Sequence, residues 1–478
     1  MALICRTVTP AQLGYPTETP TCALALFAPL AQRPWAMLLD SACHDDTRHP
    51  DARFDILVAD PMATLTTRGS HTQCQIRSEA PTLSDADPLA LLEQLQRRLL
   101  GPKDAYSAAR ATGLPFTGGA LGHFSYDLGR RFERLPSEAE DDIDLAQMAV
   151  GIFDWALMLD HQRQRLFLLV RGDEAAWLRR RNWLRDHVSP EQKTRQIEPF
   201  ALTTPWQHQL SQAAYRDRFE RVQAYLRSGD CYQINLTQRF SAGYRGDEWQ
   251  AYQRLRTKNQ APFSAFIRLP DAALLSLSPE RFLQVRGSSI QTKPIKGTRP
   301  RHQDPLKDRA AKAALKNAQK DRAENLMIVD LLRNDLGKMA APGSVRVPSL
   351  FAVESFPAVH HLVSTVTATL APNRSALDLL RGAFPGGSIT GAPKIRAMEI
   401  IEELEPARRS LYCGSIGYLS QDGQMDTSIT IRSLVARQGA IHCWAGGGIV
   451  ADSDCDEEYQ ECFDKISRIL PLLESPTT

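Results

Sequence analysis

The 478-residue sequence lacks a Cys-x-x-Cys pair, an excess of either charge and any long uninterrupted apolar run. Its nine cysteines are scattered from Cys5 to Cys462, which fits a reducing compartment and argues against a disulfide framework or a zinc site. Lys and Arg number 57 against 55 Asp and Glu, and the run Arg179–Arg181 is typical of a helix face. We therefore predict no nucleic-acid partner.

Two further absences bear on location. The N-terminus has no basic segment followed by an apolar stretch, so no signal peptide is predicted. The apolar stretch from Cys22 to Leu39 is interrupted by Pro29, Arg33 and Pro34, and nothing else approaches membrane-spanning length. The expectation is a soluble protein of the cytoplasm that does not associate with a membrane.

The pattern along the chain predicts two regions. The first region, residues 1–190, contains mostly short alternating apolar runs, such as 53–59 and 150–159. A helical segment is predicted near its end, at 173–187. The polar residues 189–204 are typical of a linker. Residues 205–478 form the second region. The whole chain of 478 residues is long enough for one large domain or two to three ordinary ones.

Helices and strands mix in the second region. Residues 212–228 have helical spacing and end at Gly229, whereas 232–238, 272–277 and 363–370 have the pattern of strands. Residues 425–437, the turn Gln438-Gly439 and residues 440–445 predict a hairpin. Because these strands do not follow regular βαβ alternation, the prediction is an antiparallel α+β fold and not a Rossmann fold.

The segment from Pro294 to Pro300 places Lys296 beside Gly297, directly after a strand-like stretch. Glu280 lies sixteen positions earlier (296 − 280), within reach across a hairpin. A lysine and a carboxylic acid so arranged can act as nucleophile and general acid. A lone lysine is more often an ordinary solvated side chain, so the other motifs must decide between these interpretations.

Spaced carboxylates occur on two predicted helices. Asp321 and Glu324 are three residues apart and share a face, and Glu458, Glu461 and Lys465 share a face of the last helix. Oxygen ligands from two helices suit Mg²⁺, whose remaining positions are filled by water and substrate. Spacing alone favours the alternative, in which these are two surface faces with salt bridges.

Two glycine-rich segments can bring backbone amides close to an anion. One is 445–449, and Arg432 ends an alternating strand nearby in the sequence; the other is 386–394. The second is not a P-loop, because its glycine spacing differs and Lys394 is not followed by Ser or Thr. Either cluster alone is more often just a turn.

Taken together, these segments resemble the chorismate-utilising enzymes, the family of anthranilate synthase component I, aminodeoxychorismate synthase component I and the isochorismate and salicylate synthases. The likeness covers nearly the whole chain and rests on residues 230–236, 278–282, 330–335, 384–394 and 458–465, in that order. It implies large antiparallel β-sheets packed as a sandwich with helices outside, as in anthranilate synthase component I.

Two positions separate the branches of this family. Lys296 before Gly297-Thr298 is similar to the members that aminate chorismate at C4, whereas anthranilate synthases typically carry alanine there. Gln233 stands where water-using members place a lysine base, which implies ammonia as the nucleophile. The resemblance therefore implies the conversion of chorismate and ammonia into 4-amino-4-deoxychorismate, on the route to 4-aminobenzoate and folate.

The resemblance also implies a role for each matching residue. Glu280 is the implied general acid and Lys296 the implied covalent nucleophile. Mg²⁺ is implied between Glu324 and Glu461, with Glu458 and Asp321 as water-mediated or outer partners. The implied chorismate contacts are Gln233, Gly297, Thr298, His361, Ser388, Tyr412, Arg432, Gly446, Gly448 and Lys465.

Partners follow from the same resemblance. No cysteine sits in a nucleophile-elbow context, so ammonia is expected from a separate glutamine amidotransferase subunit, and a separate pyridoxal-phosphate lyase is expected to eliminate pyruvate. Some relatives bind L-tryptophan in the first region. The matching positions here are Ser41, Arg53, Phe54, Pro262, Phe263 and Ser264.

Two alternatives stay open at this point. Anthranilate synthase component I uses the same substrate and metal and differs in its product. A non-catalytic tryptophan-binding or amidotransferase-scaffolding subunit belongs to another class. The intact set Glu280, Lys296, Glu324 and Glu461 argues against the second alternative, because a decayed site loses such residues.

Overall fold

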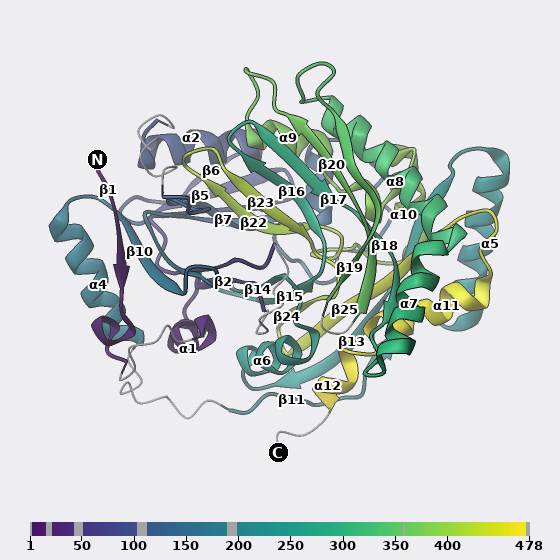
Figure 1. Ribbon diagram of the computed structural model, residues 1–478, viewed down its shortest axis with the longest axis horizontal. Helices are drawn as coiled ribbons and strands as arrows, with labels where there is room; N and C mark the ends of the chain where they lie inside the picture. The colour runs from purple at the N-terminus through teal and green to yellow at the C-terminus, as the bar shows by residue number, and fades with distance from the viewer. Residues whose placement is uncertain are drawn as a thin grey trace.

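The computed structural model describes residues 2–15, 22–42, 51–102, 112–188, 198–356 and 359–474. Within these ranges the chain forms two large antiparallel sheets with helices on their outer sides (Figure 1). The predicted antiparallel α+β architecture is confirmed. Within the described residues, no helix is both long enough and apolar enough to span a bilayer.

The first sheet has thirteen strands in the order β1-β10-β9-β3-β2-β14-β15-β24-β25-β13-β11, with β12 and β21 also paired to β13. Its strands are β1 (Leu3–Val8), β2 (Met37–Asp40), β3 (Phe54–Val58), β9 (Trp155–Asp160), β10 (Arg165–Arg171), β11 (Ala201–Leu202), β12 (Gln207–His208), β13 (Gln233–Arg245), β14 (Phe263–Arg268), β15 (Ala273–Ser278), β21 (Gly391–Ala392), β24 (Ser433–Arg437) and β25 (Ala440–Ile449).

The second sheet has twelve strands in the order β18-β20-β17-β16-β23-β22-β7-β8-β4-β5-β6, with β19 paired to β20. Its strands are β4 (Ala63–Arg68), β5 (His71–Ile76), β6 (Thr82–Ser84), β7 (Gly119–Phe124), β8 (Met148–Phe153), β16 (Arg281–Arg286), β17 (Ser289–Lys293), β18 (Ile295–Pro300), β19 (Arg346–Ser355), β20 (Val359–Thr369), β22 (Ser415–Ser420) and β23 (Met425–Ile429).

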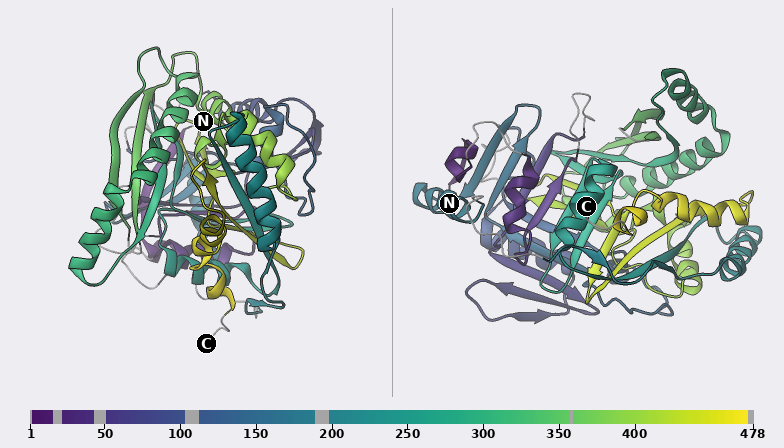
Figure 2. Two further views of the ribbon diagram at one scale, coloured as in Figure 1. Left: turned by 90° about the vertical axis from the view of Figure 1, so that its right-hand side faces the viewer. Right: turned by 90° about the horizontal axis from the view of Figure 1, so that it is seen from below.

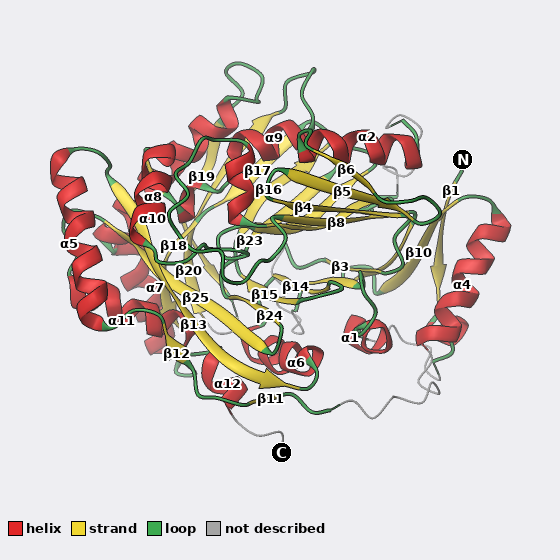
Figure 3. Ribbon diagram, turned by 180° about the vertical axis from the view of Figure 1, so that it is seen from behind, coloured by secondary structure: helices red, strands yellow, loops and turns green. Residues whose placement is uncertain are grey.

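Helices cover the outer sides of both sheets. Figures 2 and 3 show α5, α6 and α11 along the first sheet and α2 and α9 over the second. The α-helices are α1 (Ala23–Phe27), α2 (Pro88–Leu100), α4 (Glu174–Val188), α5 (Gln212–Ser228), α6 (Glu248–Asn259), α7 (Pro305–Asn317), α8 (Gln319–Gly337), α9 (Ala376–Ala383), α10 (Lys394–Leu404), α11 (Cys455–Ile466) and α12 (Leu470–Glu474). Short 3₁₀ turns are η1 (Pro10–Leu13), η2 (Ala28–Leu30), η4 (Tyr126–Arg131) and η5 (Gly387–Ile389).

One hydrophobic core lies between the two sheets and continues beneath α2 and α9, and a second lies between the first sheet and its helices. In β9, Ala156 and Met158 belong to the core between the sheets, whereas Trp155, Leu157 and Leu159 belong to the core under the helices. This alternation follows from the two-residue period of side chains along a strand. A strand buried on both faces therefore reads as a continuous apolar run in the sequence.

Two predicted extended segments are each divided between the sheets. The run 150–159 breaks at Asp154 into β8 of the second sheet and β9 of the first. The run 425–437 breaks into β23 and β24 at Arg432, whose φ of 52° lies in the left-handed region. The predicted hairpin is correct only for β24 and β25, which Gln438 and Gly439 join with φ of 51° and 77°. Two positive φ values are typical of a two-residue hairpin turn.

A third crossing places the candidate general acid. The chain leaves β15 in the first sheet and enters β16 in the second across Pro279-Glu280. Residues 1–190 and 205–478 both supply strands to each sheet, since β2 pairs with β14 and β7 pairs with β22. The N-terminal region is thus built into the same two sheets as the region that carries the chemistry.

Candidate active site

Glu280 lies buried where the chain passes from one sheet to the other. Only 4% of its surface is exposed. The backbone around it is held to β23, because Ile429 N donates to Glu280 O at 3.1 Å and Ser278 Oγ donates to Ile429 O at 2.5 Å. Both sheets therefore hold the position of this carboxyl group.

The surroundings of Glu280 favour its neutral form. Burial raises the pKa of Glu280 to about 7, against the opposing effects of Ser388, Lys296 and Arg432. Ser388 Oγ donates to Glu280 Oε1 at 2.8 Å. A carboxylic acid with a pKa near neutrality can hold a proton for transfer at physiological pH.

Lys296 reaches the same serine from β18. Its Nζ donates to the backbone oxygen of Ser388 at 3.2 Å. The register between β18 and β20 shifts between Lys296 and Thr298, where Gly297 has a φ of 71°. A side chain at Gly297 would meet Asp321 Cγ at 2.7 Å, so glycine is required at this bulge. Lys296 and Glu280 therefore both form hydrogen bonds with Ser388, Lys296 with its backbone oxygen and Glu280 with its hydroxyl.

Glycines in β25 leave room for polar side chains of the site. They lie within a strand paired to β13, not in an open anion-binding loop. A Cβ on Gly448 would lie 1.8 Å from Gln233 Nε2, and one on Gly447 would lie 2.7 Å from Glu458 Oε2. Gln233 is 1% exposed, and its Oε1 has no hydrogen-bond partner within the described residues. A buried acceptor of this kind is suited to a donor that arrives with the substrates.

Three glutamates approach one another from α8 and α11. Burial raises the pKa values of Glu324 and Glu458, and repulsion from the neighbouring glutamates adds to both shifts. Partial burial would raise the pKa of Glu461, but Lys465 at 2.5 Å, together with Lys320 and Lys296, lowers it. Figure 1 shows α8 and α11 on the same side of the molecule.

Lysines lie among these carboxylates. Lys320 Nζ is 3.4 Å from Glu458 Oε1, and Lys465 Nζ donates to Gly446 O at 2.7 Å. In the described part of the chain, no three acidic, histidine or cysteine side chains form a group compact enough to hold a metal ion. The ammonium groups of Lys320 and Lys465 balance the negative charge of these glutamates. A bound divalent cation would take over this role.

The fourth predicted metal residue, Asp321, is directed elsewhere. Its Oδ2 is 3.1 Å from Arg299 Nη2, and its carboxyl carbon lies against Gly297. The spacing of Asp321 and Glu324 predicted that both face one site. Glu324 lies near Glu458 and Glu461, whereas Asp321 contacts Arg299. In this arrangement Asp321 supports the β18 bulge that carries Lys296.

The remaining predicted chorismate contacts each have partners of their own. His361 Nδ1 and Thr298 Oγ1 are 2.8 Å apart, joining β20 to β18. Tyr412 is buried with its ring stacked parallel to Trp444 at 6.2 Å. Burial and nearby Arg468 lower the pKa of Arg432 to about 10, although Glu280 opposes the shift. Arg432 is thus a cation close to the general acid, where an anionic substrate group can offset its burial.

A separate cavity of about 280 Å³ lies on the other side of β16. Of the positions matched to a tryptophan site, Arg53, Phe54, Pro262, Phe263 and Ser264 line this cavity. Ser41 instead donates to Asp55 Oδ1 at 2.8 Å and is not part of the lining.

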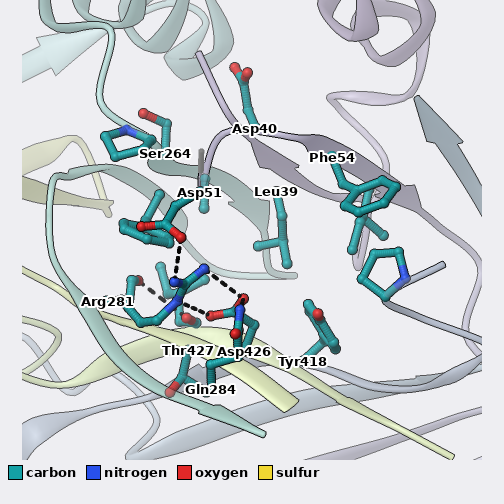
Figure 4. Close-up of a pocket in the computed structure, with 18 of the residues that line it drawn as sticks. Leu39, Asp40, Asp51, Phe54, Ser264, Arg281, Gln284, Tyr418, Asp426 and Thr427 are labelled. Carbon is teal, nitrogen blue, oxygen red and sulfur yellow. Dashed lines mark hydrogen bonds and ion pairs between the residues drawn. The ribbon is translucent and has the colours of Figure 1, made fainter. Parts of the chain in front are cut away.

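The sequence analysis missed the polar centre of this cavity. Arg281 Nη1 lies 2.7 Å from Asp51 Oδ1, and its Nε lies 3.0 Å from Asp426 Oδ1 (Figure 4). Arg281 follows Glu280 directly, so adjacent residues belong to the cavity and to the candidate active site. That adjacency was the one available signal, since Asp51 and Asp426 belong to distant segments.

Comparisons with known proteins identify the family of the chain. The model of the chorismate binding enzyme family matches residues 37–471. Aminodeoxychorismate synthase component 1 of Salmonella typhimurium is 56% identical over 98% of this chain and 100% of its own length. The same protein of Escherichia coli is 58% identical over 94% of this chain and 95% of its own length.

Among solved structures, anthranilate synthase component I from Streptococcus pneumoniae superposes with a TM-score of 0.76 at 29% identity, covering 90% of this chain and 94% of that one. This likeness agrees with the expected sandwich of two large antiparallel sheets with helices outside. The family match spans the N-terminal strands from β2 onward and the residues of the candidate site, including Glu280, Lys296 and the acidic helices. The chain therefore belongs to the chorismate binding enzyme family.

Proposed function

We propose that this chain converts chorismate and ammonia into 4-amino-4-deoxychorismate, as component 1 of an aminodeoxychorismate synthase. The observation that carries the proposal is the meeting of Lys296 and Glu280 on Ser388. A nucleophilic lysine beside a protonated carboxyl group suits the replacement of a hydroxyl by an amine. Relatives with 56% and 58% identity carry this name.

The residues support a two-step displacement. Glu280 gives its proton to the 4-hydroxyl, the C4–O bond breaks, and water leaves while the Lys296 nitrogen forms a bond to C2. Ammonia then forms the C4–N bond, the C2–N bond to Lys296 breaks, and the excess proton returns to Glu280. For the first step Lys296 must be neutral and Glu280 protonated.

The test of this proposal is the product made from chorismate, Mg²⁺ and ammonium. We expect 4-amino-4-deoxychorismate, which becomes 4-aminobenzoate only after a lyase is added. Direct appearance of anthranilate would identify the rival synthase. Absence of any turnover, also with an amidotransferase present, would favour the non-catalytic scaffold.

We also propose Mg²⁺ as the cofactor, held by Glu324 and Glu461, with Glu458 as a water-mediated partner and Asp321 as an outer one. The support is a crowded set of carboxylates neutralised by Lys320 and Lys465. When bound, the ion would offset the charge of the substrate carboxylate. Lys320 and Lys465 would then turn from the glutamates toward other acceptors.

Glu324→Gln and Glu461→Gln should each raise the Mg²⁺ concentration needed for half-maximal activity by about tenfold or more. The circular dichroism spectrum should stay unchanged, and calorimetry should show weaker Mg²⁺ binding in the presence of chorismate. Glu457→Gln is a matched control, because Glu457 is exposed in the same helix. Unaltered Mg²⁺ dependence in both variants would contradict this metal assignment.

The ammonia source is proposed to be a glutamine amidotransferase subunit. Ammonia has a pKa of about 9 and is mostly protonated at neutral pH, whereas a bound partner can deliver it neutral and close to the site, at a high effective concentration. The isolated chain should therefore use free ammonium at alkaline pH, but glutamine only with the partner present. Glutamine turnover by the purified chain at the rate seen with ammonium would refute this dependence.

The cavity beside β16 is proposed to bind L-tryptophan. It combines the aromatic rings of Phe54, Phe263 and Tyr418 with the charged groups of Arg281 and Asp51, which suits an aromatic amino acid. Calorimetry should detect L-tryptophan binding that Phe54→Ala weakens. A wild-type protein that gives no heat signal with tryptophan would remove this proposal without affecting the catalytic one.

The location is proposed to be the cytoplasm. Every cysteine within the described residues is unpaired, which suits a reducing compartment. Cell fractionation checks this, and recovery outside the cytoplasmic fraction would contradict it.

A further inference from the structure

A short turn holds both proposed catalytic groups in place. Ser388 lies in η5 and accepts from Lys296 through its backbone oxygen while its hydroxyl donates to Glu280. Any displacement of this turn would change the partners of the nucleophile and the acid together. The question is therefore what holds the turn itself.

The hydrogen bonds within the turn are long. Ile389 N donates to Gly386 O and Thr390 N to Gly387 O, each at 3.4 Å. Contacts from outside are shorter: Arg409 Nη1 donates to Ile389 O at 3.0 Å, and Asn235 Nδ2 donates to the same oxygen at 3.1 Å. These bonds hold the far end of the turn against β13 and the buried Arg409.

A buried ion pair closes the base of the same loop. Lys394 Nζ lies 2.6 Å from Asp335 Oδ2 and donates to Ala383 O at 2.8 Å. Ala383 ends α9 and Lys394 begins α10, so this one ammonium group joins the two ends of the segment 384–393. Asp335 belongs to α8 and is fully buried. The pair therefore fastens the loop to the helix beneath it.

The loop rests on α8 at the point where this pair lies. A Cβ on Gly387 would be 2.5 Å from Leu331 Cδ2 and 3.8 Å from Asp335 Oδ2. Leu331 and Asp335 are one helical turn apart on α8. Residue 387 directly precedes Ser388, and its backbone lies against the Leu331 side chain, so a displacement of this part of α8 would also displace the serine.

We infer that Asp335 and Lys394 are positioning residues, which hold the Ser388 turn so that Lys296 and Glu280 face one substrate. This inference rests on the proposed function, because it concerns the same reaction. Neither residue touches the reacting atoms. Their effect is on the geometry of the two groups that do, and misplacement of reacting groups by about 1 Å can lower a rate by about a hundredfold.

The test compares single and double substitutions in the full chain, with chorismate, Mg²⁺ and ammonium as substrates. Lys394→Met and Asp335→Asn should each lower kcat by about tenfold to a hundredfold while KM for chorismate changes by less than about threefold. Asp335→Asn removes the anionic partner of the buried Lys394, and Lys394→Met leaves the buried Asp335 with Lys338 as its remaining cation. Each single variant should therefore also lower the melting temperature. Loss of stability alone would therefore not distinguish a positioning role.

The double variant Asp335→Asn with Lys394→Met makes that distinction. It removes both charges, so its melting temperature should return toward that of the wild type, whereas kcat should stay low because the bond to Ala383 O is missing. Lys338→Met is the matched control, since Lys338 contacts Asp335 Oδ1 at 3.1 Å from the exposed side. Its kcat should remain within about twofold of the wild type.

Two outcomes would overturn the inference: recovery of kcat together with stability in the double variant, or an unchanged kcat in Lys394→Met. A wild-type chain that makes no 4-amino-4-deoxychorismate would instead refute the proposed function. The two failures can be distinguished, because the variants test the inference only when the wild type makes 4-amino-4-deoxychorismate.

Discussion

Lys296→Ala should lower the formation of 4-amino-4-deoxychorismate by at least about a hundredfold, since it removes the proposed nucleophile. Its Nζ is the atom of β18 that contacts the Ser388 turn. Lys296→Arg should not restore activity, because a guanidinium group stays protonated and cannot attack carbon. The product is measured by chromatography with chorismate and ammonium in excess.

Mass spectrometry gives this prediction a second measurement. Wild-type protein incubated with chorismate and Mg²⁺ but without ammonia, and then quenched, should carry a chorismate-derived adduct on the peptide containing residues 295–299. Lys296→Ala treated in the same way should carry none. Lys307→Ala is the control, because this lysine is exposed in the first turn of α7. Normal turnover in Lys296→Ala without any wild-type adduct would show that catalysis does not pass through a lysine intermediate.

Glu280→Gln should lower kcat by about a hundredfold to ten-thousandfold, because an amide cannot deliver the proton that the leaving hydroxyl requires. Per concentration of free ammonia, the wild-type rate should fall as the pH rises through about 7, the pKa to which burial raises Glu280. The supply of neutral ammonia rises over the same range, so rates must be expressed per concentration of free ammonia. Glu280→Gln should lack the descending limb of that corrected profile.

Stability provides the control for this variant. The pKa of Glu280 is about 7 in the folded chain and about 4.5 when unperturbed, so the folded state binds the extra proton between these values. Wild-type stability should therefore fall as the pH rises from 4.5 to 7, and this loss should persist above pH 7. Glu280→Gln should lack this contribution and melt no lower than the wild type at pH 8. An inactive variant that also unfolds there would not support an acid role.

Local patterns in the sequence predicted much of the architecture. The apolar alternation of 232–238 lies within β13, and the helical spacing of 212–228 coincides with α5. These predictions succeed because side-chain period is a local property of helices and strands. The turn Gln438-Gly439 was equally readable, since two residues with positive φ favour such a pair.

The points where the chain changes sheets could not be read in the same way. Residues 425–437 alternate without a visible break, yet β23 and β24 lie in different sheets with Arg432 between them. A strand that is buried in either sheet has the same apolar pattern. Only the packing of the two sheets decides where the chain must turn.

The sequence by itself determined the chemical groups of the candidate site: a lysine before a glycine, a carboxyl group after a proline, and carboxylates at helical spacing. The tertiary structure alone decided how these groups meet. It brings Lys296 and Glu280 together on Ser388, which is 92 and 108 residues away from them in the chain. It turns Asp321 to Arg299, and it fastens the serine turn with Asp335 and Lys394. The physical reason is that spacing constrains contacts only within one element, whereas contacts between elements depend on how the sheets and helices pack.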